Sequence, residues 1–274
     1  MNSAAAQPLP IGVFDSGIGG LTVLKAVREA LPREHLVYLG DTARLPYGTK
    51  SPASIARYAC QATRSLQQEG IKLLIVACNT ASAVALDALR EQMAPLPVVG
   101  VVGPGATAAV AARPGGSHLV LATETTVRLG AYRRAIAERD ADARVRELPC
   151  EMLVALAEEG WTDGEAATAI VRRYVDQVAD EGPFDSVILG CTHFPILRGV
   201  IGAAFAEGTS IVDSASTTAA FTARLLADED LGNPQDSAGS LRLLATDGAT
   251  RFARVGGQFL GETLSADDIR IVDL

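Results

Sequence analysis

The sequence has few of the residues that common cofactors and nucleic acids require. Lysine occurs only at Lys25, Lys50 and Lys72, and 24 Lys and Arg residues stand against 32 Asp and Glu residues, for a net charge of −8. An acidic chain offers no cluster of cations to displace counterions from nucleic acid, so no nucleic-acid partner is expected. Pyridoxal phosphate is also disfavoured, because its Schiff base needs a lysine and none lies beside either of the two strand-end cysteines described below.

Long apolar runs and closely spaced cysteine pairs are missing as well. No run approaches the roughly 20 apolar residues that cross a bilayer, so no membrane contact is expected. The segment from Met1 to Pro10 lacks the positive region and apolar core of a signal peptide, which predicts a cytoplasmic protein. In that reducing compartment Cys60, Cys78, Cys150 and Cys191 are expected to be free thiols.

The pattern that is present is an alternation of short apolar strands and amphipathic helices, typical of an α/β fold with mainly parallel sheets flanked by helices. The 274 residues suffice for one large or two ordinary domains. Two stretches of the chain have a similar order of predicted strands and helices, which predicts two pseudo-symmetric domains with the active site in the cleft between them. The strand at 211–213 is expected to lead back into the first domain, and one helix is expected after 123–126, through Ala137. The predicted domains are residues 1–99 with 212–274, and residues 100–211.

Two of the apolar runs end in a cysteine. The run from Leu73 leads to Cys78, and the run from Ser186 leads to Cys191, with small polar residues and a helical pattern after each. Open α/β sheets bind ligands beyond the carboxyl ends of their strands, where helix N-termini direct N–H groups at anions. A single free cysteine is usually a small buried hydrophobe, but the repeated pattern favours a paired chemical role. Cys60 falls inside a predicted helix and is expected to be structural.

A glycine-rich turn, from Asp15 to Gly20, follows the first predicted strand. Its glycines allow a sharp turn and close approach of backbone N–H groups to an anion. A dinucleotide fingerprint requires a third glycine at the position of Thr22. NAD is therefore not expected, and no other cofactor is expected either.

If the two halves face each other, Cys78 and Cys191 lie on opposite sides of one small ligand. One thiolate then removes a proton from carbon while the other thiol donates a proton to the opposite face. A free thiol has a pKa of about 8.5, so neighbouring groups must adjust the balance. Candidates are Asp15 beside the first cysteine, and His193 with a carboxylate from a predicted helix at 151–159 beside the second. A helix cap at Asp15, a structural hydrogen bond at His193 and a zinc site formed by both cysteines with His193 are the alternatives.

Four motifs together resemble those of the glutamate racemases, in that family's order. They are IGVFDSGIGG at 11–20, DTARLPYG at 41–48, ACNTAS at 77–82 and GCTHFP at 190–195. The resemblance implies a cofactor-independent enzyme that interconverts L- and D-glutamate by two-cysteine proton transfer at Cα. It also implies a role in supplying D-glutamate for peptidoglycan synthesis, and the family's dimers lead us to expect a homodimer.

The resemblance also implies residue roles. Cys78 is expected to act on D-glutamate with help from Asp15, and Cys191 on L-glutamate with help from His193 and a glutamate. The family's helix motif carries two prolines that this chain lacks, so its register assigns the assisting carboxylate to Glu158, with Glu159 as the neighbouring alternative. Cys150 falls on a non-catalytic cysteine of the family. The implied substrate contacts are Asp15, Ser16, Pro46, Tyr47, Gly48, Asn79, Thr80, Thr123, Thr126, Thr192 and His193.

Three other functions stay open at this point. An aspartate or broad-specificity amino-acid racemase shares the same fold, although His193 in the last motif favours the glutamate branch. A non-catalytic dicarboxylate-binding protein and a metal-dependent hydrolase are the others. In every case an anionic substrate must bind through helix N-terminal N–H groups, hydroxyls and amides, because no cation lies in the motifs except Arg44.

Overall fold

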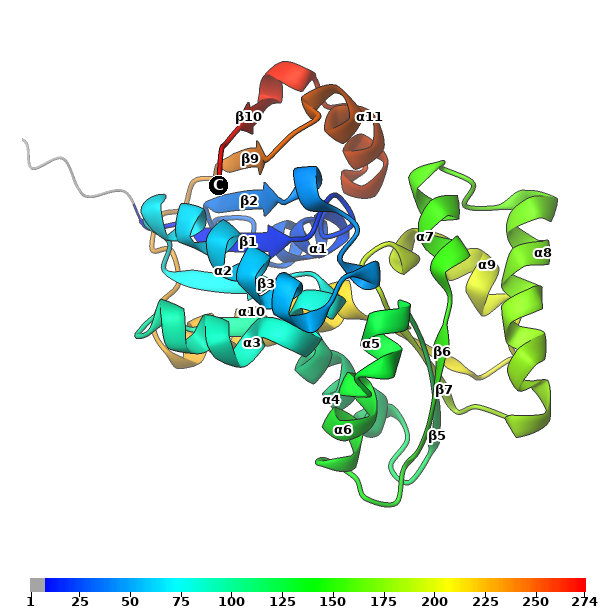
Figure 1. Ribbon diagram of the computed structural model, residues 1–274. Coiled ribbons are helices and arrows are strands. Elements are labelled where there is room, and N and C mark those ends of the chain that lie inside the picture. The colour runs from blue at the N-terminus through cyan, green and yellow to red at the C-terminus, as the bar shows by residue number, and fades with distance from the viewer. Residues whose placement is uncertain (1–7) are drawn as a thin grey trace, which may run out of the picture.

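The computed structural model describes residues 8–274 and contains two parallel β-sheets with helices packed around them (Figure 1). Most of the N-terminal segment, on which the expected lack of a signal peptide rests, lies outside the described residues. Within residues 8–274, no helix combines the length and the apolar character that crossing a bilayer requires.

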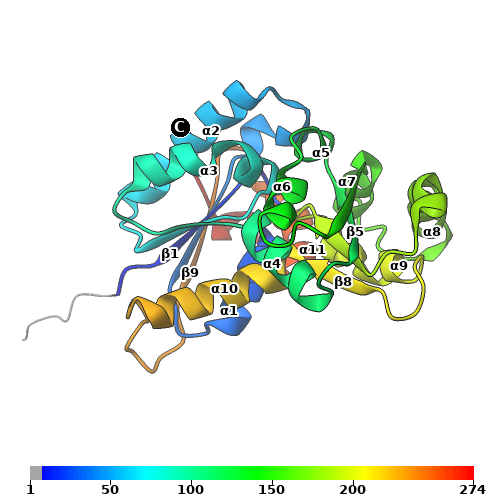
Figure 2. The same ribbon diagram turned by 90° about the horizontal axis from the view of Figure 1, so that it is seen from below.

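The larger sheet has six strands in the order β10-β9-β2-β1-β3-β4, and every neighbouring pair is parallel. Its central strands are buried along their whole length, because helices cover both faces and leave no solvent-exposed side. Figure 2 shows α2 and α3 on one face and α1 and α10 on the other. The strands are β1 (Ile11–Asp15), β2 (Leu36–Gly40), β3 (Leu73–Val76), β4 (Val98–Gly100), β9 (Leu241–Ala245) and β10 (Ile269–Ile271).

The helices of this half begin where the sequence signals predict. Ser51 caps the second helix by accepting a hydrogen bond from the Ser54 N–H at 3.3 Å, and Pro52 occupies its first position. The helices are α1 (Leu21–Ala30), α2 (Pro52–Gln68), α3 (Asn79–Met93), α10 (Ser214–Asp228) and α11 (Ala249–Leu260).

The smaller sheet has four parallel strands in the order β6-β5-β7-β8. The single helix expected to end at Ala137 is instead two helices, because Gly130 adopts the left-handed conformation at φ 58° and interrupts the hydrogen-bond ladder. The strands are β5 (Ser117–Ala122), β6 (Arg144–Pro149), β7 (Ser186–Gly190) and β8 (Ser210–Asp213). The helices are α4 (Val102–Ala112), α5 (Glu124–Arg128), α6 (Ala131–Ala137), α7 (Glu151–Glu158), α8 (Gly164–Val175) and α9 (Arg198–Gly202).

The prediction for the strand at 211–213 was wrong. This strand, β8, pairs with β7 in the smaller sheet, with Ile211 opposite Val187, and the chain returns to the larger sheet only through α10. A short apolar strand carries no signal for which of two sheets it joins, since that is decided by long-range pairing. The predicted boundary after residue 211 therefore falls inside β8, and the rest of the division into domains stays a prediction.

The carboxyl ends of the strands in the two sheets point toward each other (Figure 1). Direct hydrogen bonds join the two halves there: Thr22 Oγ1 donates to the Thr192 carbonyl at 2.8 Å, and Thr125 Oγ1 donates to the Gly48 carbonyl at 2.6 Å. The loops that follow β1, β2, β3, β5 and β7 consequently converge on one place.

Candidate active site

A cavity of about 380 Å³ lies where these loops meet. Both cysteines of the repeated pattern line it, one from each half of the molecule. Asp15 and Thr126 lie outside the lining, although both contact residues that form it. The predicted residues in the lining are Ser16, Pro46, Tyr47, Gly48, Cys78, Asn79, Thr80, Thr123, Glu158, Cys191, Thr192 and His193, and the others are Leu45, Thr49, Glu151, Val154, Ala155 and Gly190.

Cys78 lies directly before α3, two residues after the end of β3, and only 5% of its surface is exposed. Its Sγ accepts a hydrogen bond from the Ala81 N–H at 3.3 Å. Burial raises the pKa of the thiol to about 12, and the charge of Asp15 adds to the rise, against donors from Ser16 and Ala81. The resting group is therefore a thiol that can donate a proton.

Asp15 ends β1 and is 1% exposed. Its Oδ2 accepts a hydrogen bond from the Gly17 N–H at 2.9 Å, while the cap position of α1 is taken by Gly20. The cap alternative for Asp15 is therefore wrong. Burial raises the pKa of Asp15, opposed by the charge of His193 and by backbone donors. Asp15 acts on the first cysteine from behind, without lining the cavity.

Cys191 follows β7 and has a different set of neighbours. His193 Nδ1 lies 3.7 Å from Cys191 Sγ, and His193 Nε2 lies 3.1 Å from Glu158 Oε1. Glu159 directly follows α7 and its side chain is exposed, so the carboxylate beside the histidine is Glu158. The three side chains form a continuous chain from carboxylate to imidazole to thiol.

This arrangement shifts the pKa values of His193 and Glu158 in opposite directions. Burial acts to lower the pKa of His193, but the hydrogen bonds to Cys191 and Glu158 together outweigh it and raise the pKa to about 10. The hydrogen bond from His193 lowers the pKa of Glu158, against burial. Near neutral pH the pair is an imidazolium and a carboxylate, which places a positively charged ring beside the Cys191 sulfur.

Hydroxyl and amide groups form the rest of the wall. Thr80 Oγ1 lies 3.0 Å from Thr123 Oγ1 and 3.1 Å from Thr126 Oγ1, a cluster that joins α3 to the loop after β5. The Asn79 side-chain oxygen accepts a hydrogen bond from the Tyr132 hydroxyl at 2.7 Å. Among the described lining residues none is Lys or Arg, so hydroxyl, amide and backbone N–H groups, together with the His193 imidazolium, are the donors available to an anion.

Sequence reasoning missed four residues that support this wall. Asp41 is fully buried and accepts hydrogen bonds from the Tyr47 hydroxyl at 2.6 Å and from Arg44 Nε at 2.7 Å. It opens one of the quoted motifs, so the signal was available. The other three come from stretches without a motif: they are Tyr132, Ser214, whose Oγ lies 3.4 Å from Asn79 Nδ2, and Arg251, which pairs with Glu158.

Cys60 and Cys150 lie away from the cavity. Cys60 is half-buried within α2, and Cys150 is fully buried at the start of α7, where its Sγ lies 3.5 Å from the Leu148 carbonyl oxygen. Within residues 8–274, no group of three or more His, Cys, Asp and Glu side chains is arranged to hold a metal ion.

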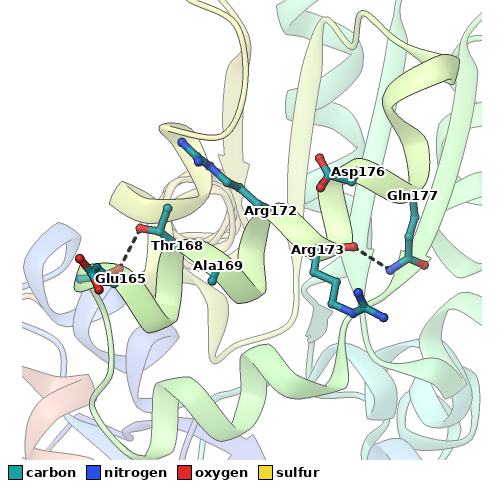
Figure 3. A pocket seen from close by; sticks show the side chains of 8 residues that line it. Glu165, Thr168, Ala169, Arg172, Arg173, Asp176 and Gln177 are labelled. Atoms are coloured by element: carbon teal, nitrogen blue, oxygen red, sulfur yellow. Dashed lines mark hydrogen bonds between the residues drawn. The ribbon is translucent and has the colours of Figure 1, made fainter.

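A larger hollow runs along the exposed face of α8, lined by charged and polar side chains (Figure 3). Thr168 Oγ1 donates to the Gly164 carbonyl at 2.8 Å and Gln177 Nε2 donates to the Arg173 carbonyl at 3.1 Å, so these groups serve their own helix. All its lining comes from α8 and the turn after it, and none of the predicted site residues is included. Size alone therefore does not make it the site.

Two thiols at opposing strand ends, each with its own acid–base neighbours and around one small polar cavity, define an amino-acid racemase. The model of the Asp/Glu/hydantoin racemase family matches residues 11–222. The chain is 46% identical to a glutamate racemase of Geobacter metallireducens over 93% of each chain. The chain belongs to the glutamate racemases within that wider family.

Solved structures agree with this family in both fold and extent. A glutamate racemase of Francisella tularensis, solved in complex with D-glutamate, has a TM-score of 0.89 at 34% identity, with 97% of each chain covered. A glutamate racemase of Thermus thermophilus has a TM-score of 0.85 at 42% identity, again with 97% of each chain covered. The predicted α/β fold with mainly parallel sheets is thereby confirmed.

Proposed function

We propose that this protein interconverts L- and D-glutamate without a cofactor, by removing the Cα proton with one cysteine and returning a proton to the opposite face with the other. The observation that carries the proposal is the position of Cys78 and Cys191, which line one cavity from the ends of strands in different sheets. General acid–base groups act when they lie within reach of the proton that they transfer.

In the direction from L to D, the Cys191 thiolate removes the Cα proton and the Cys78 thiol donates its own. The imidazolium of His193 lies beside Cys191, and the raised pKa of Cys78 keeps that group protonated. After one turnover the proton has moved from Cys78 to Cys191, and the reverse reaction starts from that state. Asp15 and the His193–Glu158 pair restore the starting state by proton exchange.

The substrate carboxylates are held by neutral donors around the cavity. The D-glutamate complex of the Francisella tularensis relative supports a glutamate-sized ligand in this fold. Backbone N–H groups at the N-terminus of α3 add a favourable dipole for an anion. The contacts in this proposal are Ser16, Tyr47, Gly48, Asn79, Thr80, Thr123 and Thr192, with Pro46 shaping the wall and Asp15 and Thr126 supporting from behind.

The D-glutamate made in this way would supply peptidoglycan synthesis, and the reaction would take place in the cytoplasm. A homodimer is part of the same proposal. Light scattering on the purified protein tests this assembly: a mass near 57 kDa, twice the 28.5 kDa of one chain, supports it, and the mass of a single chain removes it.

Exchange of the Cα proton with deuterated water tests the reaction. We expect deuterium to enter both enantiomers of glutamate, with aspartate exchanging far more slowly. Exchange on aspartate alone would instead support the aspartate racemase alternative. Undiminished turnover after exhaustive chelation is expected, and loss of turnover there would favour the metal-dependent hydrolase.

The cysteine variants separate an enzyme from a binding protein. Cys78→Ser and Cys191→Ser are each expected to lower racemisation by about 10²- to 10⁴-fold, the contribution typical of a general acid or base. Cys60→Ser, which removes a thiol from α2 away from the cavity, is the matched control and should keep wild-type activity. If both active-site variants bind and act as the wild type does, the two-cysteine proposal is wrong.

A further inference from the structure

A positively charged side chain from the opposite half of the molecule contacts the His193–Glu158 pair beside Cys191. Arg251 lies in the first turn of α11, which connects β9 to β10, whereas Glu158 ends α7 in the other half (Figure 1). Arg251 Nη2 lies 2.5 Å from Glu158 Oε2, and His193 Nε2 lies 3.1 Å from Glu158 Oε1. Each carboxylate oxygen thus has its own charged partner, one from each half.

A carboxylate held at both oxygens has a fixed plane. Without Arg251 the Glu158 side chain, which is 18% exposed, is free to rotate toward solvent and to loosen its bond to His193. The Arg251 side chain itself is 51% exposed, so the ion pair contributes little to folding stability. What Arg251 supplies is therefore orientation of the carboxylate rather than stability of the fold.

Two further contacts bring α11 against the same group. The ring of Phe259 meets the His193 ring edge-on, with centroids 5.2 Å apart. At Gly160, which follows α7, an added Cβ would lie 2.9 Å from the Gln258 side-chain oxygen, so α11 packs tightly against that turn. These contacts join α11 of one half to α7 and His193 of the other.

We propose that Arg251 is a positioning residue for proton transfer at Cys191, which holds Glu158, and through it His193, in place from the opposite half of the molecule. This inference rests on the proposed two-cysteine function and deepens it. It makes the acid–base support of one cysteine depend on a residue of the other half, whereas Cys78 takes its hydrogen bond from Ala81 within its own half.

The titratable groups around His193 give the expected pH signature. Cys191 and Glu158 contact the imidazole, Asp15 acts on it through its charge, and Arg251 stands beyond Glu158. Arg251 contributes to the lowered pKa of Glu158. Its removal raises that pKa, so the acidic limb of the kcat profile should move to higher pH.

The rate of racemisation alone does not separate the two cysteines. L- and D-glutamate are equal in energy, so any variant changes kcat/KM equally in both directions. The enantiomers of 3-chloroglutamate avoid this, because one thiolate removes the Cα proton and the electron pair of that C–H bond forms the Cα–Cβ double bond as chloride leaves. The proton stays on the sulfur and no second thiol is needed; water then releases ammonium and the 2-oxo acid.

Arg251→Gln, Arg251→Lys and the control Arg254→Gln are compared in this assay. Arg254 is exposed on the same helix and makes no ion pair with any described residue. We expect Arg251→Gln to slow elimination about five- to tenfold for the enantiomer that Cys191→Ser abolishes, and to leave the other enantiomer within about twofold. Arg251→Lys should be intermediate and Arg254→Gln unchanged, and Arg251→Gln should add nothing in a Glu158→Gln background.

The outcomes distinguish this inference from the function on which it rests. Equal slowing of both enantiomers, or no slowing by either Arg251 variant, would overturn the role of Arg251. If Cys191→Ser abolishes elimination from both enantiomers or from neither, the two-cysteine proposal itself is wrong. Arg251→Lys keeps the charge, and so provides the comparison if the glutamine variant does not fold.

Discussion

The surroundings of Cys78 and Cys191 differ more than the similar sequence patterns suggest. The Cys78 thiol is buried, accepts a hydrogen bond from a backbone N–H and lies near the Asp15 carboxyl group, and its pKa is raised to about 12. Cys191 faces an imidazole whose pKa is raised to about 10 and whose partner carboxylate is fixed from the other half. The first site favours the protonated sulfur, and the second places an imidazolium beside its sulfur.

The difference shows how one fold gives two identical side chains different acid–base neighbours. Both thiols follow a buried parallel strand, so the fold accounts for their positions but not for their neighbours. Burial and the Asp15 carboxyl group act on Cys78, whereas an imidazolium and its carboxylate partner lie beside Cys191. In the proposed reaction, the removal and return of one proton therefore take place between two unlike sets of neighbours.

The largest effect is expected at the imidazole. His193→Asn removes the cation beside Cys191 and should lower racemisation by about 100-fold. Elimination from the 3-chloroglutamate enantiomer that depends on Cys78 should be nearly unchanged, which a chloride-release assay measures. A control is His35→Asn, whose ring bonds Ser240 away from the cavity. Equal losses for the two enantiomers would break the comparison between the two sides.

His193 also links folding stability to pH. Its pKa is about 10 in the folded protein and about 6.5 in the unfolded chain. A raised pKa means that the folded state binds the proton more tightly, so the stabilisation is complete below pH 6.5 and is lost between pH 6.5 and about 10. His193→Asn should therefore lower Tm more at pH 6 than at pH 10, and a pH-independent change would contradict the raised pKa.

The next effect is on thiol reactivity. Because burial raises the pKa of Cys78 to about 12, little thiolate is present near pH 7, and iodoacetamide should modify Cys78 at least about tenfold more slowly than free cysteine. Mass spectrometry of a Cys60→Ser variant follows Cys78 and Cys191 without labelling at the half-buried third thiol. Glutamate should protect both, and labelling of Cys78 as fast as that of free cysteine would contradict its raised pKa.

Local pattern was enough to predict the fold class and the strand-end cysteines, since burial of a strand is apparent from neighbouring residues, whereas the choice of Glu158 came from the register of the family's helix motif. The pairing of β8 and the break at Gly130 were not predicted, because they depend on which sheet a short strand meets and on one backbone angle. Tyr132 and Arg251 were missed for the same reason: each reaches the site from an element with no motif, through contacts that only the folded chain creates.

Two adjacent glycines offer a smaller and more selective perturbation. A Cβ at Gly19 would overlap the His193 ring and lie 2.6 Å from Thr192 Oγ1, whereas a Cβ at Gly20 would lie 2.5 Å from the Asp15 Cβ. We expect Gly19→Ala to slow the Cys191-dependent step and Gly20→Ala the Cys78-dependent step, each about tenfold. A misplacement of 1 Å can cost about 100-fold, and here the neighbouring side chains absorb part of the shift.

The chloroglutamate enantiomers report each step separately, and a crystal structure of each variant shows whether the intended neighbour moved. If both glycine variants slow elimination from the same chloroglutamate enantiomer, the turn acts as a unit on a single cysteine. If each variant slows elimination from a different enantiomer, neighbouring residues of one turn support the two cysteines independently.

The smallest effect is on stability and has the opposite sign to the loss of activity. Burial raises the pKa of Asp15, so protonated Asp15 favours the folded state below its unfolded pKa of about 3.8, and this advantage is lost as the pH rises through the folded value. Asn is neutral throughout and its side-chain oxygen still accepts the bond from the Gly17 N–H. Asp15→Asn should therefore raise stability by roughly 0.5–2 kcal/mol at pH 8, with little gain at pH 4, while it slows the Cys78-dependent step. Thermal unfolding at the two pH values measures this; an equal gain at both would mean that burial does not raise the pKa of Asp15, and the contrast between the two cysteines would then rest on His193 alone.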